Sequence, residues 1–117
     1  MNPPVVAIGC VANLFSRMMH FKVAGDVEMG HTHQFDHLTL LAFGKLRVTV
    51  DGVATEFTAP HMIYINKDKV HELVALADNT VAYCIHALHD KETGEILDPS
   101  MIPDGVNPLS LASPVST

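Results

Sequence analysis

Four histidines are spaced so that they could bind one metal ion. His31 and His33 stand two residues apart, and because side chains two apart on a β-strand share a face, their imidazoles can converge on one point. His37 begins an apolar run four residues later, so a short loop at 34–36 could fold that run back beside the pair. Imidazole is the commonest protein ligand of transition metals. The spacing therefore predicts a metal site.

A fourth histidine, His71, follows a polar turn at 66–69 and begins another strand-like run. A residue at the start of a barrel strand can face inward, where it would complete a set of four nitrogen ligands. Burying several neutral imidazoles on one barrel face without a metal or hydrogen-bond partners would be costly. We therefore expect one divalent transition metal, bound by His31, His33, His37 and His71.

Other side chains could serve chemistry at that metal. A bound substrate needs a proton donor or acceptor within reach, and the candidates are Tyr64, Tyr83 and His86, whose orientation the sequence leaves open. The remaining histidines are expected to be surface or structural residues: His20, His61 and His89.

Residues beside the ligands have weaker claims to a role. Thr39 and Leu41 share the strand parity of His37 and could line the pocket, although ordinary core positions are favoured. Asp36 and Glu72 adjoin ligands and could orient imidazoles as hydrogen-bond acceptors, but strand alternation turns Glu72 away from the histidine before it.

The elements that must position these residues are short β-strands. Runs rich in Val, Ile, Leu, Thr, Phe and Tyr, separated by turn residues, extend from about residue 16 to residue 88. The dipeptide Asp51-Gly52 can supply the positive φ angles of a type I′ hairpin turn, and Gly44 marks another tight connection. An antiparallel meander of at least seven strands is expected over 18–23, 27–31, 37–43, 46–50, 53–58, 62–65, 71–76 and 80–88.

Such a series of strands must close into a barrel or pack as two facing sheets, because a long open sheet would leave exposed edges. The expected fold class is all-β, an antiparallel jelly-roll barrel in a single small domain over residues 1–117, with the barrel core at about 16–88. An irregular C-terminal tail is expected at about 97–117.

Composition argues against several classes of function. The 117 residues are 48% apolar, enough for one core, and the formal charge is −6 with scattered Lys and Arg, so nucleic acid is not an expected partner. No apolar stretch reaches the roughly 18 residues needed to cross a bilayer, so no membrane association is expected. No basic residue precedes Arg17, which argues against a secretory signal and favours a cytoplasmic location. Cys10 and Cys84 are interpreted as small core residues.

The first histidine cluster resembles a known motif. Gly25, His31, His33, His37 and Gly44 have the spacing of the first conserved motif of the cupin superfamily, G-x5-H-x-H-x3,4-E-x6-G. Every spacing matches, and His37 stands where the family usually has glutamate.

The second cupin motif, G-x5-P-x-G-x2-H-x3-N, is matched only by its histidine, His71. Its other positions hold Pro60, Asn66, Asp68 and Ala75. The resemblance covers roughly residues 25–75, and its specific part is the first motif.

The resemblance implies a small barrel in which His31, His33 and His71 bind a metal and His37 replaces the glutamate ligand. Cupins bind iron(II), manganese, nickel, zinc, cobalt or copper, and they include dioxygenases, isomerases, decarboxylases, lyases, storage proteins and sensors, so the resemblance selects no reaction. Four neutral imidazoles would leave a net charge of about +2, one unit above the set with glutamate, which favours anionic oxygen ligands. Iron(II) is the first choice of metal, followed by manganese or nickel, with zinc a common occupant after purification.

Two functions follow from these expectations. The first is a metal-dependent enzyme, a dioxygenase that acts on a small organic oxygen ligand. The second is a non-catalytic module that binds a metal or small ligand and acts through a partner or as a dimer. Because the run at 38–43 is apolar on both alternating faces, a second sheet or another subunit must cover its outer face. A homodimer is expected, and the apolar segment 5–15 could supply a strand to it.

Overall fold

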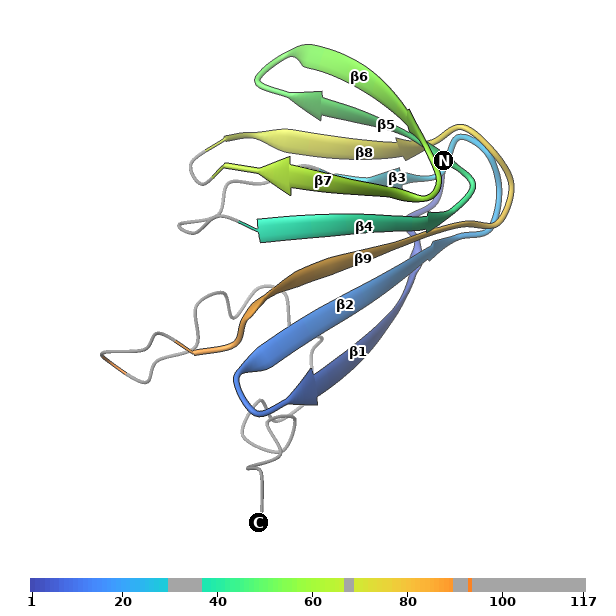
Figure 1. Cartoon of the computed structure of the whole chain (residues 1–117). Helices are drawn as coiled ribbons and strands as arrows, with labels where there is room; N and C mark the ends of the chain where they lie inside the picture. Colours follow the sequence, from blue (N-terminus) through green and yellow to red (C-terminus); the bar gives the residue numbers. More distant parts are fainter. Residues whose placement is uncertain (30–36, 67–68, 90–92, 94–117) are drawn as a thin grey trace.

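The computed structural model describes residues 1–29, 37–66, 69–89 and 93, and the regular elements among them are all β-strands (Figure 1). In chain order they are β1 (Val5–Val11), β2 (Leu14–Phe21), β3 (Val27–Glu28), β4 (His37–Phe43), β5 (Lys45–Val50), β6 (Val53–Thr58), β7 (His61–Ile65), β8 (His71–Ala75) and β9 (Thr80–Ala87). The expected bounds of β4 and β6 are confirmed, and those of β5, β7, β8 and β9 differ by one residue at one end. Within the described residues, we find no helix long and apolar enough to cross a membrane.

The N-terminal strands differ most from expectation. The strand expected at 18–23 is β2, which begins at Leu14, and β1 precedes it as a separate strand. Ala12, with a φ of 50°, makes the tight turn between them. The sequence gives no Gly or Pro signal at this turn, and the segment 5–15 was expected only as a possible source of a strand for a dimer. The strand expected at 27–31 is confirmed only as β3; residues 30 and 31, like the tail at 97–117, lie outside the described residues.

The strands form two antiparallel sheets. The five-stranded sheet has the order β1-β2-β9-β4-β7, and the four-stranded sheet has the order β3-β8-β5-β6. Because only β1–β2 and β5–β6 are neighbours both along the chain and within a sheet, the expected meander is wrong. At every other connection between described strands the chain passes to the opposite sheet, so each sheet covers the apolar inner face of the other. The expectation of an all-β jelly roll is confirmed.

Apolar side chains from both sheets fill the space between them. Phe15, Met19 and Phe21 occupy alternate positions of β2 and are at most 1% exposed. Leu46 and Val48 of β5, from the opposite sheet, belong to the same buried cluster. The period of two along each strand therefore produces the core, as the sequence pattern indicates.

The core also contains the next two residues of β4 that have the same strand parity as His37. Thr39 and Leu41 are 1% and 0% exposed, which confirms that ordinary core positions suit them. Cys84 is buried and Cys10 is half-buried, and both are free thiols. Burial raises the pKa of the Cys10 thiol above its ordinary value, so this cysteine remains protonated at neutral pH.

Glycines make two tight connections of different kinds. Asp51 and Gly52 have φ angles of 47° and 82°, which confirms the positive-φ hairpin turn between β5 and β6. Gly44, with a φ of 89°, joins β4 in one sheet to β5 in the other. A Cβ atom at Gly44 would lie 2.4 Å from Oγ1 and 2.9 Å from Cα of Thr80, whereas at Gly52 nothing lies within 4 Å. The sheet crossing at Gly44 thus requires both its φ angle and its missing side chain.

Replacing Gly44 and Gly52 with alanine separates the requirement for a positive φ, which both positions share, from the requirement for a missing side chain, which only Gly44 has. Gly52→Ala should lower the free energy of unfolding by about 1 kcal/mol, the cost of a positive φ for a residue with a Cβ. Gly44→Ala should lower it by about 3 kcal/mol, because backbone crowding against Thr80 adds to that cost. Urea denaturation followed by circular dichroism measures both values. Equal losses at the two positions would contradict the close approach of Gly44 to Thr80.

Candidate metal centre

Two of the predicted ligands, His37 and His71, lie at one end of the barrel. His37 begins β4, His71 begins β8, and β9 ends just after His86, all at the end of the barrel that lies on the left in Figure 1. Leu38 pairs with Ile85, and continuing this antiparallel register places the backbone of His37 opposite that of His86. The start of β4, the start of β8 and the end of β9 therefore lie at the same end of the barrel.

His71 lies on the inner face of β8. It is 7% exposed, and it alternates with the outward-facing Glu72 before the buried Leu73. Its Nδ1 lies 3.3 Å from the carbonyl oxygen of Lys69. Because a carbonyl oxygen can only accept, Nδ1 carries the proton in this hydrogen bond and Nε2 carries the lone pair. Metal-binding histidines commonly donate their second ring nitrogen to a backbone carbonyl in this way.

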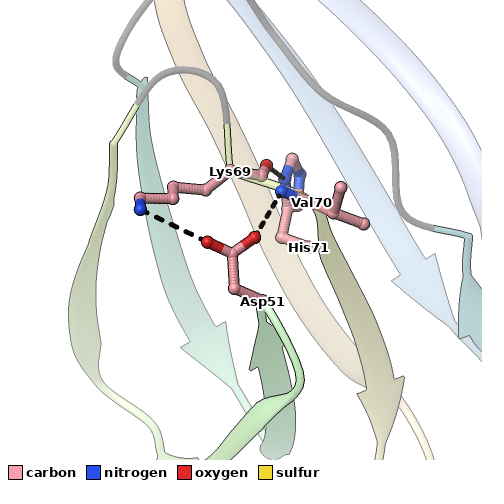
Figure 2. A network of polar contacts seen from close by, with 4 residues as sticks. All are labelled: Asp51, Lys69, Val70 and His71. Atoms are coloured by element: carbon pink, nitrogen blue, oxygen red, sulfur yellow. Dashed lines mark hydrogen bonds and ion pairs between the residues drawn. The ribbon is translucent and has the colours of Figure 1, made fainter.

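The turn between β5 and β6 holds the segment that leads into His71 (Figure 2). Oδ1 of Asp51 accepts a hydrogen bond from the backbone N–H of Val70 at 3.1 Å, and Oδ2 lies 3.3 Å from Nζ of Lys69. The backbone N–H of Asp51 donates to the carbonyl oxygen of Val70 at 2.8 Å. The ion pair is about half exposed and contributes little. The two hydrogen bonds between Asp51 and Val70 therefore hold this segment more strongly than the ion pair does. These contacts of Asp51 with Lys69 and Val70 are called the clamp below.

The sequence pattern indicates Asp51 only as a residue of the hairpin turn and gives no sign of its contact with residues 69 and 70. The contact depends on β8 lying beside β5 with His71 opposite Val50. Pairing between strands so distant along the chain leaves no local signal. We therefore regard Asp51 as a positioning residue for His71 that only the fold reveals.

His86 is the second histidine on the inner face of the described barrel. It is 8% exposed, and its ring stacks on Phe15 with centroids 4.7 Å apart and planes at 27°. Its Nδ1 bonds to the carbonyl oxygen of Ala87, which again assigns the proton to Nδ1. The sequence left the orientation of His86 open, and its shared parity with the buried Ala82 and Cys84 now resolves it. His86 thus faces the barrel interior.

The other proton-transfer candidates point away from the interior. Tyr64 is 61% exposed on β7, and Tyr83 occupies the opposite parity of β9 from His86. The outward orientation expected for Glu72 is confirmed, since it alternates with two buried neighbours. His31, His33 and Asp36 lie outside the described residues, as does the side chain of His37.

The histidines expected to be surface or structural residues are so in the structure. His20 Nε2 lies 3.1 Å from Oδ1 of Asn79, and His61 is exposed with its ring 4.8 Å from that of Phe57. The backbone N–H of His89 donates to Oδ1 of Asn13 at 2.7 Å. In the part of the chain that the structure describes, no group of three or more His, Cys, Asp and Glu residues could hold a metal.

A charged pair crosses the barrel between the sheets. Arg17 of β2 lies between Phe15 and Met19 on the same, inner face of the strand. Glu28 of β3 pairs in register with the buried Leu73 of β8. Nη1 of Arg17 lies 3.1 Å from Oε1 of Glu28, and the side chains are 15% and 17% exposed. Each partly buried charge therefore neutralises the other, and the pair ties β3 to the opposite sheet.

A hollow lies beside the start of β8. It has a volume of about 290 Å³ and is lined by Met29, Thr49, Gly52, Val70, His71 and Glu72. This is enough space for a small molecule, at the low end of ordinary ligand pockets of roughly 300–1,000 Å³. Thr49 and Glu72, which line it, lie on the outer side of the four-stranded sheet, whereas the side chain of His71 faces inward.

Known structures share this arrangement of strands. A cupin 2 domain-containing protein from Halorhodospira halophila superposes with a TM-score of 0.57 at 20% sequence identity, over 62% of this chain and 51% of that one. The chain has a cupin fold. It spans about half the length of that protein.

Two further structures superpose over a larger share of this chain. KdgF from Halomonas sp. has a TM-score of 0.64 at 17% identity, over 74% of this chain and 80% of that one. A conserved protein with a double-stranded β-helix domain from Klebsiella pneumoniae has a TM-score of 0.64 at 16% identity, over 73% and 76% of the two chains. No protein-family model matches the sequence, and no curated protein is significantly similar to it.

The cupin fold explains the glycines of the first motif. Gly25 and Gly44, its first and last residues, have φ angles of 97° and 89°, a region that residues with a Cβ rarely adopt. The N–H of Gly25 donates to the carbonyl oxygen of Ala75 at 2.8 Å, which ties the start of the motif to the end of β8. The motif glycines are therefore structural requirements at turns that flank the histidines.

The clamp on His71 can be tested without any metal. Asp51→Gly removes the carboxylate and tolerates the positive φ, so the amide of Val70 should exchange its hydrogen about 5-fold faster, because one hydrogen bond worth about 1 kcal/mol is lost. Glu56→Ala is the matched control, since it removes the Lys45–Glu56 ion pair of 3.5 Å on the neighbouring hairpin. Exchange at Val70 should be unchanged in this control. Hydrogen exchange followed by NMR measures both, and equal protection of Val70 in wild type and Asp51→Gly would contradict the clamp.

Proposed function

We infer that this chain is a metal-binding cupin that holds one divalent transition metal, with iron(II) the first choice, through His31, His33, His37 and His71. The observation that carries the inference is His71: a buried histidine on the inner face, whose Nδ1 donates to a backbone carbonyl. This tautomer suits metal binding through Nε2. We further infer a dioxygenase function on a small organic oxygen ligand.

The donor set fits such a metal. His37 stands at the start of β4, with the parity of the buried Thr39 and Leu41, at the same barrel end as His71. The resemblance to the first cupin motif supplies His31 and His33 as the remaining ligands. Imidazole nitrogen suits iron, nickel, copper and zinc, so the chemistry of the donors agrees with the proposal but does not by itself choose the metal.

The substrate class follows from charge. Four neutral imidazoles would compensate none of the charge of a divalent ion, so the site would favour an anionic oxygen ligand such as an enolate or a carboxylate. When bound, iron(II) would supply a Lewis acid and a source of electrons for dioxygen.

His86 is the residue of this chain proposed to move a proton. It faces the interior from β9, and stacking on Phe15 holds the plane of its ring. Donation from Nδ1 to the carbonyl of Ala87 leaves Nε2 as the basic atom, which could accept the hydroxyl proton of a bound enol or diol. The surrounding apolar core, including Phe15 at 0% exposure, would limit access of water to this proton.

Metal analysis of variants tests the ligand set. Tag-free protein should contain about one metal ion per chain, and His71→Ala should weaken metal binding by more than the roughly 10–100-fold that loss of an outer hydrogen-bond partner costs. His61→Ala is the matched control, because His61 is an exposed histidine on β7 and is not a predicted ligand. Calorimetric titration of the metal-free proteins measures the affinities. Full metal content and unchanged affinity in His37→Ala would show that His37 is not a ligand.

Oxygen uptake separates the two functions expected from the sequence. The iron-loaded protein should consume dioxygen with one class among diketones, enediols, thiols and aromatic diols. His86→Ala should slow that uptake about 100-fold or more while metal content is unchanged, because a general base commonly contributes that much. Metal binding without uptake in any class would leave the alternative, a non-catalytic metal- or small-ligand-binding module.

A further inference from the structure

An apolar cleft lies between β6 and β7, each of which is the last strand of its sheet. We propose that this cleft selects the substrate: it takes an apolar group of about the size of a phenyl ring, carried by the anionic oxygen ligand of the metal. This assignment rests on the proposed metal-binding function for the oxygen end of the ligand, and on the cleft alone for its apolar end.

The strand register places the cleft next to two of the candidate ligands. Val50 lines the cleft and pairs with His71, and Ile65 lines it and pairs with His37. Paired residues of antiparallel strands project from the same face of a sheet, with Cβ atoms about 5 Å apart. The side chain of Val50 therefore lies beside that of His71 on the inner face, and Ile65 lies beside the backbone of His37. One ligand can thus reach both the metal and the cleft.

The cleft is accessible because β7 leaves the inner face of β6 partly uncovered. The two strands belong to different sheets, and the chain joins them between Thr58 and His61, at the end of the barrel away from the candidate ligands (Figure 1). Val48 of β5 is 2% exposed, whereas Val53, which begins β6 on the same face, is 69% exposed. Apolar side chains of β6 are therefore open to a ligand at the end where His71 lies.

The walls of the cleft are mostly apolar. The apolar residues that form them come from β5, β6 and β7 and are Val48, Val50, Val53, Phe57, Ile63 and Ile65. Thr55 and Tyr64 complete the lining, so within the described residues no charged side chain borders the cleft. An apolar group gains by leaving water for such walls, whereas a hydroxyl group would exchange its water contacts for few partners. The cleft therefore disfavours polyhydroxy ligands.

The volume of the cleft limits the apolar group that it can hold. It is about 160 Å³, and a cavity of about 150 Å³ with aliphatic and aromatic walls holds one benzene molecule. One phenyl ring or one branched alkyl group of similar volume fits this space, and a two-ring group does not. The substrate class is therefore a carboxylate, enolate or β-diketonate that carries a single substituent of that size.

Binding of fluorobenzene to the metal-free full chain tests the cleft without the metal. The probe should shift the methyl NMR signals of Val50, Val53 and Ile63 until the site is saturated. Val53→Trp should weaken this binding about 10-fold or more, because the indole ring would occupy the cleft. Ala54→Trp is the matched control, since Ala54 is the next exposed residue of β6 and points to the opposite face. It should bind fluorobenzene as the wild type does.

Two carboxylates of equal charge test whether the cleft and the metal act on one ligand. Phenylacetate should bind the iron(II)-loaded chain about 10-fold or more tightly than acetate does, because burial of the phenyl ring adds a favourable transfer free energy. This advantage should disappear in Val53→Trp and persist in Ala54→Trp. Calorimetric titration without oxygen measures the affinities, and metal analysis beforehand establishes that each protein is loaded.

Circular dichroism establishes that both tryptophan variants fold, and the methyl shifts of the unaltered chain decide the matter if they do not. Shifts confined to Val27 and Val74, which line a hollow of about 580 Å³ on the outer face of the four-stranded sheet, would overturn the proposal, as would no shifts at all. Equal affinities of the loaded wild type for acetate and phenylacetate would also overturn it. A chain that takes up no metal would instead contradict the proposed metal centre, and fluorobenzene would still test the cleft.

Discussion

Pairing of β9 between β2 and β4 is the constraint on which the rest of the structure depends. Its register sends Ala82, Cys84 and His86 into the barrel, and it sends Tyr83 and Ile85 to the outer face. A shift of one residue would exchange the two sets, exposing the histidine and burying the tyrosine. One strand therefore determines which of its side chains face the candidate site and which face outward.

The candidate site is supported by hydrogen bonds from a part of the chain that contributes no ligand. The tight turn between β5 and β6 places the Asp51 carboxylate beside Val70, and the neighbouring carbonyl of Lys69 accepts from His71 (Figure 2). A histidine at a strand start would otherwise have several rotamers available to it. The hydrogen bonds between Asp51 and Val70 hold the preceding backbone and so reduce that freedom.

Local signals in the sequence predicted a large part of this structure. Positive φ at Asp51 and Gly52, burial of Thr39 and Leu41, and the start of a strand at His71 each follow from patterns of a few residues. The order of strands within the sheets could not be predicted, because pairing such as β2 with β9 depends on competition among distant segments. The orientation of His86 and the clamp by Asp51 were missed for the same reason. The four-histidine ligand set remains a prediction from spacing and resemblance.

The central claim is that four imidazoles bind one divalent metal, and X-ray absorption spectroscopy of the metal-loaded full chain tests it most directly. Metal-free protein would be loaded with one equivalent of iron(II) without oxygen, and the fine structure would be fitted for the number and type of ligands. The account predicts four imidazole nitrogens, with the remaining scatterers oxygen and none of them sulfur, because Cys10 and Cys84 lie in or against the core. Two or fewer imidazoles, or a sulfur ligand, would contradict the account.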